Sequence, residues 1–506
     1  MPAEIDAAFT ELPSRQLADA ALTRLRELGC EHGDFRLERS RDNYVSLHDA
    51  RLDGSQDSED VGFAVRVVHD GSWGFASAVD LTVESAVAVA EQAVAVAQLS
   101  RPLSTERVDL ADEPTYGDVT WVSDYDIDPF TISDQAKVAL LAEWSAGLLA
   151  HDIVAHSDAS LHHVLENKFY SDTNGTTTTQ QRVRTQCSLE IVGIDKESGR
   201  FDTMRTLAAP VGRGWEWLTG GIYDWAAELD EMPELLTEKL RAPTVEGGDY
   251  DLVIHPSNLF LTIHESIGHA TELDRALGYE ANYAGTSFAT FDKLGSLRYG
   301  SEAMNITGDR TAQHGLSTVG YDDEGVASQS WDIVKDGVLV GYQLDRPMAH
   351  TYGAELNGGR SNGCAYADSP GHIPIQRMAN VSLQPAPDGP DTDGLISQVE
   401  RGIYVVGDRS WSIDMMRYNF QFTGQRFFRI EDGQLKGQLR DVAYQATTTD
   451  FWGSMEAVGG PQTYELSGAF NCGKAQPGQV APVSHGCPSA LFENVAILNT
   501  VQEAGR

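Results

Sequence analysis

The sequence predicts an α+β fold, with an N-terminal α/β domain of antiparallel sheet and helices and a C-terminal domain of mainly antiparallel, barrel-like β-structure. Three observations lead to this prediction. Helical stretches with an apolar stripe lie mainly in the first half, strand-like alternation recurs along the chain, and Asn-Gly or Asp-Gly dipeptides separate pairs of strands. One further helix, around residue 264, is expected to belong to the C-terminal domain.

The N-terminal elements are expected to be a helix, two long strand regions and a second helix. In "SRQLADAALTRLREL" apolar residues recur at helical spacing, as Leu17, Ala21, Leu25 and Leu28. The strand regions are "FRLERSRDNYVSLHDARLDG" and "VGFAVRVVHDGSWGFASAV", and the second one turns at Asp70-Gly71. The Ala- and Val-rich helix that follows runs from Val83 to Leu99, with Thr82 as its N-cap.

A polar stretch, "SRPLSTERVDLADEPTYGD", predicts a linker or long loop before the central segment. That segment contains a helix around "SDQAKVALLAEWSAGLLA" and strands that turn at Asn174-Gly175. A change of pattern in "RAPTVEGGDYDLVIHPSN" predicts a boundary between residues 241 and 250. We therefore expect an N-terminal α/β domain in residues 1–105, a central α/β segment in residues 106–245 that completes the N-terminal half, and a C-terminal domain in residues 246–506.

Short strands dominate the predicted C-terminal domain. Hairpins are expected at Asp336-Gly337 in "WDIVKDGVLVGYQL" and at Asp432-Gly433 in "RFFRIEDGQLKGQL". Few amphipathic helices intervene, and "DTDGLISQVERG" is one of them. This pattern indicates an antiparallel sheet or a partly closed barrel.

The chain is strongly acidic. Its 506 residues include 75 Asp and Glu against 37 Lys and Arg, for a formal net charge of −38. Binding to nucleic acid or to anionic membranes requires Lys and Arg to neutralise phosphates, so both functions are disfavoured. A solvated surface that resists aggregation accounts for the acidity. Adaptation to high salt and recognition of cationic partners are the alternatives.

Neither an export signal nor a membrane span is predicted. The start, "MPAEIDAAFTELPSRQ", lacks a basic segment followed by an apolar core, and the Ala- and Val-rich helix is interrupted by Glu91 and Gln92. The cysteines are odd in number and widely scattered, as Cys30, Cys187, Cys364, Cys472 and Cys487. These features together predict reduced thiols and a cytoplasmic location.

The segment from Asn258 to Gly278, "NLFLTIHESIGHATELDRALG", brings two histidines and a glutamate together in the sequence. Apolar residues at helical spacing predict one helix through the segment, with a buried stripe of Phe260, Ile263, Ile267, Ala270, Leu273 and Leu277. Either Ser257 or Asn258 is expected to cap the start of this helix, and Gly278 is expected to end it.

His264 and His269 are five residues apart, whereas a zinc-binding HExxH helix has its histidines four apart. Two positions five apart differ by roughly 140° around a regular helix, so their rings diverge. A shared metal ion therefore requires a distorted turn such as a π-bulge. Gly268 is the residue most tolerant of that distortion. Spacing alone leaves open a metal site or two ordinary helix histidines, one facing solvent and one in the core.

Four stretches of the chain carry a family resemblance. They are "HESIGHATELDRALG", "LSGAFNCGKAQPGQVAPVSHGCPSALFENVAI", "GFAVRVVHDGSWGFASAVDLTVESAVAVAEQAV" and "IPIQRMANVSL". The first resembles the active-site helix, the second the C-terminal segment, the third the first domain and the fourth a strand of the TldD/PmbA family of metallopeptidases. The resemblance extends from about residue 15 to residue 500 and makes residues 246–506 the metallopeptidase domain.

The resemblance implies a zinc ion held by His264, His269 and Cys472, with Glu265 acting as general base on a water. Two imidazoles, one thiolate and one water make a four-coordinate catalytic site. Cys487, with His485 two residues before it, competes with Cys472, and spacing alone does not choose between them. The family motif places the ligand at Cys472. Glu272 either orients His269 or faces solvent.

The resemblance also implies the function of a cytoplasmic zinc metallopeptidase that cuts unfolded or disordered peptides. Family members of this type work as dimers, either of like chains or with a related subunit that lacks HExxxH. Two alternatives remain open, a noncatalytic partner-type subunit and a zinc hydrolase of nonpeptide amides. The "GGRSNG" turn from Gly358 to Gly363 is a further candidate for substrate contact.

Overall fold

The N-terminal sheet has two chemically different faces, because apolar and charged residues alternate along its strands. The structure is a computed structural model that describes residues 4–476 and 478–503. Phe35 and Phe63 lie on the apolar face and join a core formed with the helices. Arg36 and Arg66 lie on the opposite face and contact the C-terminal half.

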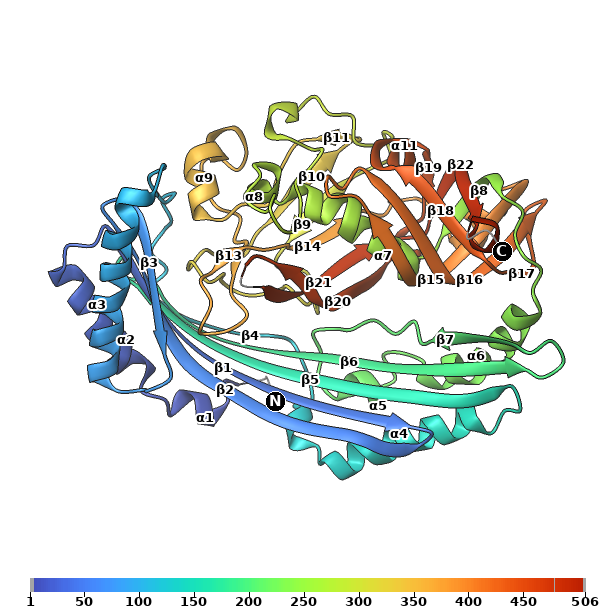
Figure 1. Cartoon of the computed structure of the whole chain (residues 1–506), viewed down its shortest axis with the longest axis horizontal. Helices are drawn as coiled ribbons and strands as arrows, with labels where there is room; N and C mark the ends of the chain where they lie inside the picture. Colours follow the sequence, from blue (N-terminus) through green and yellow to red (C-terminus); the bar gives the residue numbers. More distant parts are fainter. Residues whose placement is uncertain (1–3, 477, 504–506) are drawn as a thin grey trace.

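Seven strands form this sheet in the order β3-β2-β1-β5-β6-β4, and β7 also pairs with β6. The pairs are antiparallel except for β4 and β6, which are parallel. The strands are β1 (His32–His48), β2 (Arg51–His69), β3 (Ser72–Ala78), β4 (Asp118–Val122), β5 (Val154–Asp172), β6 (Thr177–Asp195) and β7 (Arg200–Arg205). Their lengths, up to 19 residues, make the sheet long and curved (Figure 1).

Helices cover the convex face of the sheet, with α2 and α3 against β1 to β3, and α4 and α6 against β5 to β7 (Figure 1). They are α1 (Ala7–Thr10), α2 (Ser14–Glu27), α3 (Val83–Ser100), α4 (Asp134–Leu149), α5 (Glu216–Thr219) and α6 (Trp225–Arg241). Thr82 caps α3 as predicted, since its hydroxyl accepts a hydrogen bond from the Ser85 amide. In the described part of the chain, no helix combines the length and apolarity that a membrane crossing needs.

The C-terminal half contains a closed barrel in the order β15-β8-β22-β18-β16, which β15 closes by pairing with β16. Its strands are β8 (Gly248–Ile254), β15 (Arg401–Ile413), β16 (Asn419–Glu431), β18 (Val442–Thr447) and β22 (Ala490–Asn499), with β17 (Gln434–Leu439) and β19 (Met455–Val458) attached. The β8–β15 pair is parallel, and the other barrel pairs are antiparallel.

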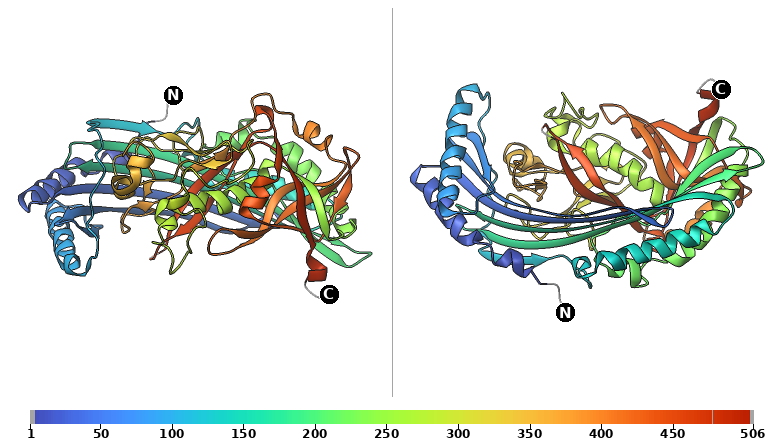
Figure 2. Two further views of the ribbon diagram at one scale, coloured as in Figure 1. Left: turned by 90° about the horizontal axis from the view of Figure 1, so that it is seen from above. Right: turned by 60° about the horizontal axis from the view of Figure 1, so that its bottom comes forward.

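Shorter elements surround the barrel, and the yellow segments among them lie between it and the blue end of the N-terminal sheet (Figure 2). The strands are β9 (Ile306–Asp309), β10 (Ser330–Lys335), β11 (Val338–Leu339), β12 (Ala365–Tyr366), β13 (Ile375–Gln376), β14 (Asn380–Leu383), β20 (Glu465–Lys474) and β21 (Gln479–Cys487). The helices are α7 (Pro256–Ile263), α8 (Leu273–Ala276), α9 (Arg346–Tyr352), α10 (Thr392–Ile396), α11 (Thr448–Gly453) and α12 (Thr500–Glu503). The predicted α+β fold class, with a barrel-like C-terminal domain, is confirmed.

The Asp-Gly dipeptides form hairpin turns as the sequence predicts. Both residues of each pair adopt left-handed backbone angles, with φ of 48° and 65° at Asp70-Gly71, 47° and 77° at Asp336-Gly337, and 49° and 72° at Asp432-Gly433. Two consecutive left-handed residues are the requirement of a type I′ turn, which Asp and Gly satisfy at low cost. These three turns join β2 to β3, β10 to β11 and β16 to β17.

A buried layer of charges joins the concave face of the sheet to the C-terminal half. Arg66 of β2 pairs with Glu324 at 2.9 Å, and Lys168 of β5 pairs with Asp323 at 2.6 Å. The Lys168 ammonium also donates to the Ala367 carbonyl at 2.7 Å. Buried pairs of this kind add little net stability but are costly to misalign. They therefore hold the two halves in one relative orientation.

Candidate metal centre

Helix α7 begins two residues earlier than predicted. His255 is its N-cap, and the imidazole Nδ1 accepts a hydrogen bond from the Ser257 amide at 3.2 Å. The prediction that Ser257 or Asn258 caps the helix is wrong, because Pro256 occupies the first helical position, where its fixed φ is suited to helix entry. Asn258 instead ties the helix to the barrel through the carbonyls of Gly407 and Thr423.

The turn between the two histidines is a π-turn, as the five-residue spacing requires. Residues His264–Gly268 form one π-helical turn, in which the His269 amide donates to the His264 carbonyl. A 3-10 turn follows at His269–Thr271, and Glu272 then adopts an extended backbone with ψ of 114°. The predicted distortion is confirmed, but the prediction of one continuous helix to Leu277 is wrong. Gly278, with φ of 91°, does end the segment.

Tertiary contacts hold this π-turn in place by bonding the carbonyls that a regular helix would pair internally. The Tyr299 hydroxyl donates to the Ser266 carbonyl at 2.5 Å, and the Gln343 amide group donates to the Gly268 carbonyl at 2.7 Å. A Cβ at Gly268 would lie 2.5 Å from the sulfur of Met378. Because φ at Gly268 is −53°, glycine is needed here for close packing rather than for backbone freedom.

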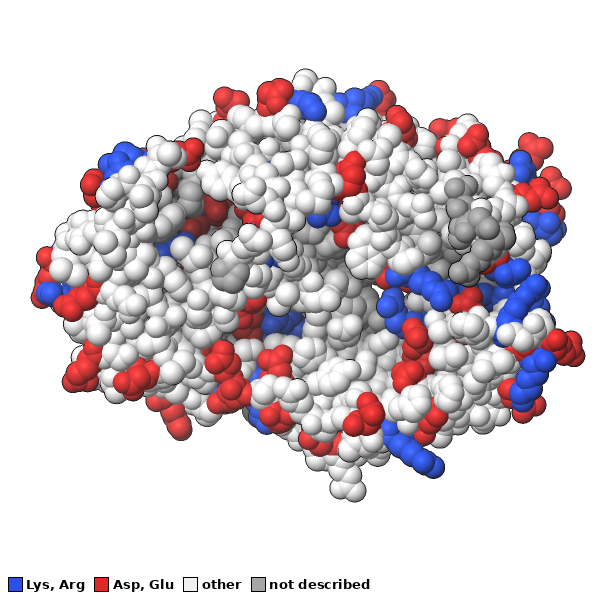
Figure 3. Space-filling model, viewed as in Figure 1, with Lys and Arg blue, Asp and Glu red and all other residues white. Residues whose placement is uncertain are grey.

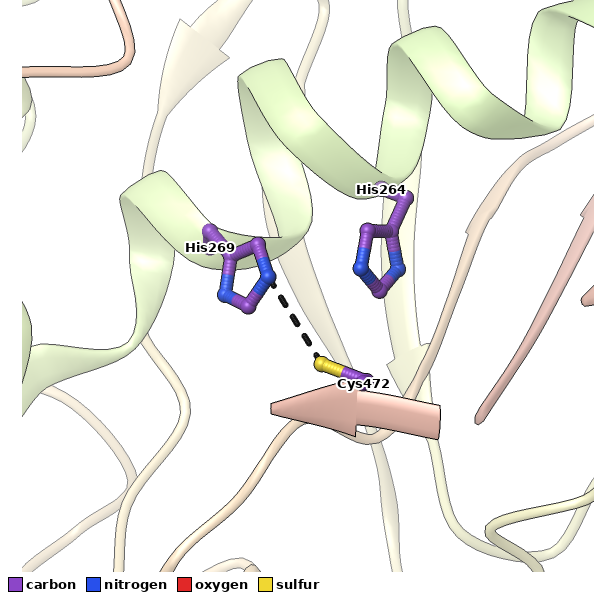
Figure 4. Close-up of side chains that lie close together, drawn as sticks. All are labelled: His264, His269 and Cys472. Atoms are coloured by element: carbon purple, nitrogen blue, oxygen red, sulfur yellow. Dashed lines mark hydrogen bonds between the residues drawn. The ribbon is translucent and has the colours of Figure 1, made fainter. Parts of the chain in front are cut away.

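His264, His269 and Cys472 come together at this turn (Figure 4). One donor atom from each residue lies within 4.8 Å of the other two. His269 Nε2 is 3.6 Å from Cys472 Sγ, and the two imidazole rings are 4.7 Å apart between centroids, at 79° to each other. Cys472 lies on β20, where a bulge between Ala469 and Cys472 interrupts the pairing with β21.

The hydrogen bonds of two neighbouring residues assign the tautomers of the histidines. His485 Nδ1 is 2.8 Å from the Val381 carbonyl and must donate to it, so His485 Nε2 accepts from His264 Nδ1 at 2.7 Å. His269 Nδ1 donates to the Glu272 carboxylate at 2.9 Å. In both His264 and His269 the Nε2 lone pair is therefore left for a metal. Burial lowers the pKa of both His264 and His485, which favours their neutral forms.

Glu272 lies behind His269 and is fully buried. Its carboxylate also contacts Arg275 Nε and Lys474 Nζ, each at 3.2 Å. Burial opposes ionisation of Glu272, but Lys474 and the bond from His269 hold the pKa of this carboxyl well below its usual range. An ionised carboxylate that orients a ligating histidine is common in metal sites. Of the two alternatives for Glu272, the structure supports orientation of His269.

Cys472 differs from Cys487 in its electrostatic surroundings. Burial opposes the Cys472 thiolate, but His269 and Arg377 outweigh it and lower the pKa of this thiol. Burial raises the pKa of the Cys487 thiol well above its usual range, and its sulfur lies 3.8 Å from the Pro256 carbonyl at the start of α7. A metal ligand must be the thiolate, so the surroundings favour Cys472.

Glu265 directly follows His264 in the π-turn and is held by Arg417. A guanidinium nitrogen of Arg417 contacts Glu265 Oε2. Burial opposes ionisation, but His264, His269 and Arg417 together lower the pKa of Glu265. Arg417 lies in the turn between β15 and β16 with φ of 63°, and Thr448 donates to its carbonyl at 2.7 Å. The carboxylate is therefore ionised and fixed beside the donors.

A cavity of about 240 Å³ lies between the N-terminal sheet and the C-terminal half, and its lining reaches the residue before Cys472. Phe260 and Leu261 of α7 line it, together with Ala469–Asn471, which directly precede Cys472 on β20. Residues Gln186–Ser188 of β6 form the opposite wall. The visible surface is also hollowed between the two halves, and acidic side chains are numerous around it (Figure 3).

The sequence did not predict three residues of the centre, His485, Arg377 and Arg417. His485 was noted only as the residue two before Cys487, although alternate residues on a strand share a face. Arg377 donates to the carbonyls of Cys472 and Gln479. The "GGRSNG" turn is tied to the segment between β11 and α9, where Asn362 accepts from the Leu344 amide and donates to the Tyr342 carbonyl; its predicted contact with substrate stays a prediction.

The donor set suits zinc better than a hard cation. Two neutral imidazoles and a thiolate are ligands that Zn²⁺ prefers, whereas Mg²⁺ and Ca²⁺ prefer oxygen. All three residues are buried, and their orientations are set by other side chains. Zinc is therefore the ion that these residues fit best, with one position left for water or substrate.

Removing the imidazole that supports His264 is expected to weaken metal binding. His485→Leu deletes the acceptor for His264 Nδ1–H, and loss of such a partner typically lowers metal affinity about 10- to 100-fold. His485→Gln keeps an acceptor and should restore part of the affinity. Competition with a chromophoric chelator measures both values. His350→Gln, on the exposed end of α9, serves as control, and equal affinities in all four proteins would contradict the assigned tautomer.

The chain is similar to known proteins over nearly its whole length. A family model described as PmbA/TldA metallopeptidase C-terminal domain matches residues 247–499, and one described as PmbA/TldA metallopeptidase domain 1 matches residues 33–97. A metalloprotease of Methanocaldococcus jannaschii is 26% identical over 468 residues, which cover 92% of this chain and 96% of that protein. A protein of Saccharolobus solfataricus, named zinc metalloprotease TldD homolog, is 25% identical, with 94% and 98% covered.

Solved structures share the fold. A crystal structure of a Thermotoga maritima protein superposes with a TM-score of 0.75 at 15% identity and covers 96% of this chain and 100% of that chain. The crystal structure of TldE from Thermococcus kodakarensis superposes with a TM-score of 0.69 at 19% identity, with 94% and 99% covered. At these identities the likeness concerns the architecture of both halves.

Proposed function

The chain belongs to the PmbA/TldA metallopeptidase family, called TldD/PmbA above, and from that premise we propose that it hydrolyses peptide bonds of unfolded or disordered peptides with the help of a zinc ion. His264, His269 and Cys472 would hold the ion. The observation that carries the proposal is the convergence of these three donors beside the ionised, buried Glu265.

A zinc ion in this position supplies a Lewis acid that polarises a carbonyl and lowers the pKa of water to about 7. Glu265 serves as the general base. Arg417 contacts Oε2 of Glu265, so we assign the proton transfers to Oε1. Oε1 takes a proton from the attacking water and later gives it to the leaving amine. Arg417 acts as a positioning residue, because its contact keeps the carboxylate oriented. Glu272 and His485 keep the two imidazoles aligned.

The strand β20 supports an extended substrate. In the described part of the chain, β20 pairs with β21 alone, so its other edge is open to an added strand. Strand β20 lines the 240 Å³ cavity with Ser467–Asn471, which directly precede Cys472. Phe470 of β20 packs against His162 of β5 at 5.3 Å between ring centroids, which narrows the passage. Backbone pairing in a narrow passage suits unfolded peptides and excludes folded ones.

Two further features of the proposal concern assembly and location. We propose a dimer, either of two like chains or with a related subunit that lacks HExxxH. We place the protein in the cytoplasm, since a reduced Cys472 is needed and all five cysteines, each in the described part of the chain, are free thiols.

Cleavage of a mixed peptide pool tests this function. Mass spectrometry of the products, with and without a zinc chelator, should reveal internal cleavage of unfolded peptides that the chelator stops and added zinc restores. The same assay is repeated with equimolar HExxxH-lacking partner. Zinc content without peptide cleavage in either assay would overturn the proposal and favour a noncatalytic subunit. Release of products from small nonpeptide amides alone would favour the amide hydrolase.

A further inference from the structure

A second group of metal-ligating side chains lies at the tip of the β1–β2 hairpin, on the other half of the molecule. It consists of His48 at the end of β1, Asp49 in the turn and His156 on β5. One donor atom of each lies within 4.8 Å of the other two. The sequence alone assigns no role to these residues, and His156 is more than a hundred positions from the other two.

The two distances from Asp49 to the histidine nitrogens match those between ligands of a single ion. Asp49 Oδ2 is 3.4 Å from His48 Nε2 and 3.0 Å from His156 Nδ1. Two ligands that lie about 2.0 to 2.1 Å from a tetrahedral zinc ion are about 3.3 Å apart. The imidazole rings stack at 5.4 Å between centroids with 23° between their planes, and one nitrogen of each ring lies near the same carboxylate oxygen.

The orientation of His48 is set from behind, as it is for His269 in the first centre. Asp158, directly opposite His48 on β5, lies 2.7 Å from His48 Nδ1. This bond places a proton on Nδ1 and turns Nε2 towards Asp49, where a bound metal ion would take the place of a second proton. A carboxylate that binds the far nitrogen of a ligating histidine raises its basicity and holds its ring in place.

Asp49 is also held in place. Its Oδ1 accepts from the Ser157 amide at 3.1 Å, and its own amide donates to the Ser157 carbonyl at 2.8 Å. These two bonds leave Oδ2 directed at the histidines. The next residue, Ala50, donates from its amide to Ser145 of α4 at 3.0 Å. The carboxylate is therefore positioned by strand β5 and by helix α4 before any ligand arrives.

We propose that His48, Asp49 and His156 form a second metal site that takes a divalent transition-metal ion, with Asp158 orienting His48. Two imidazoles and a carboxylate suit Zn²⁺, Co²⁺, Ni²⁺ and Cu²⁺, and they suit Mg²⁺ and Ca²⁺ poorly. At least one coordination position stays open to water. Both histidine side chains are 52% exposed, so a bound ion should dissociate far more readily than an ion in the buried centre.

The ion would join two pieces of the N-terminal half, the tip of the β1–β2 hairpin, which holds His48 and Asp49, and strand β5, which holds His156. Along β5, His156 and His162 are an even number of residues apart, so both lie on the face that meets the C-terminal half. The opposite face carries Leu47 and Leu161, which pack with α4. Binding to the folded state alone stabilises it by mass action, so metal should raise the unfolding temperature of this half.

Cobalt titration of the full-length, untagged protein tests the proposal. With the first centre loaded with zinc, Co²⁺ is expected to bind as one additional equivalent, giving visible ligand-field bands without the near-ultraviolet charge-transfer band of a thiolate. The double variant His48→Gln/His156→Gln should lose this equivalent, or bind it more than about tenfold more weakly, while keeping its zinc and its peptide cleavage. The exposed His151→Gln variant is the matched control and should behave as the unmodified chain.

Two results would overturn the proposal. One is the absence of an additional equivalent in the unmodified chain, and the other is unchanged cobalt binding in the double variant. Calorimetric unfolding adds a second measurement, since zinc should raise the unfolding temperature of the unmodified chain more than that of the double variant. Equal increases of the unfolding temperature in both proteins would mean that zinc stabilises the chain at another site, which also contradicts the proposal. Neither measurement depends on the peptidase assay, so failure of the proposed function leaves this test intact.

Discussion

A Glu265→Gln variant is expected to retain its zinc and to lose peptide hydrolysis. The substitution leaves His264, His269 and Cys472 in place, and glutamine has nearly the same shape as glutamate. It removes the carboxylate that accepts the proton, and general base catalysis contributes about 10²- to 10⁴-fold to a rate. Single-turnover cleavage of one identified peptide, measured together with zinc content, gives both quantities in the same sample.

The experiment requires a control for the contact between Glu265 and Arg417. The glutamine amide of the variant no longer neutralises the Arg417 guanidinium. Glu302→Gln provides it, since this side chain is 87% exposed and pairs with Arg298 on the surface. That variant should cleave at the normal rate. Two outcomes for Glu265→Gln would refute its role as the base. One is normal cleavage, and the other is loss of zinc in proportion to activity, which would make Glu265 a structural residue.

A Cys472→Ala variant is expected to lose most of its zinc and, with it, all cleavage. Loss of a residue that merely orients a ligand lowers affinity about 10- to 100-fold, and removal of one of three protein ligands should exceed that range. Two imidazoles would remain, so weak binding at high zinc concentration is expected. Metal content after dialysis, followed by titration with a chelating dye, measures the change.

Cys487→Ala is the matched control for this experiment. Both cysteines are buried, both belong to the β20–β21 hairpin, and each substitution removes one sulfur. The Cys487→Ala variant should keep full zinc occupancy, because the Cys487 sulfur lies against the Pro256 carbonyl at the start of α7. Cobalt substitution adds a signature, since the thiolate charge-transfer band should vanish in Cys472→Ala alone. If Cys487→Ala strips the metal and Cys472→Ala does not, the assignment of the ligand is wrong.

The π-turn could be predicted from the sequence because helix geometry is the same in every protein. Residues five apart diverge on a regular helix, so a metal shared by His264 and His269 requires an inserted residue. The prediction of where the helix ends failed for a different reason. Glu272 adopts an extended backbone, in which its carboxylate meets His269, Arg275 and Lys474. No local pattern signals contacts with a residue two hundred positions away.

The choice between the two cysteines also exceeded what spacing could provide. The family resemblance pointed to Cys472, and the structure supplies a physical reason, because His269 and Arg377 lower the pKa of that thiol while burial raises the pKa of Cys487. Arg417 had no sequence signal, since it lies in an ordinary-looking turn between two strands. Only the closure of the barrel by β15 and β16 brings that turn to Glu265.

Some features of this protein are set by residues adjacent in the sequence, and others are set by contacts that form only in the folded chain. The sequence by itself determined what depends on neighbours along the chain, namely the Asp-Gly turns, the cap of α3, the alternation of the sheet strands and the need for a widened turn between the two histidines. These features follow from the conformational preferences of a few adjacent residues. The tertiary structure alone decided which distant groups surround each donor. Burial and nearby charges set tautomers, thiolate character and ionisation, and these depend on residues that only the folded chain brings together.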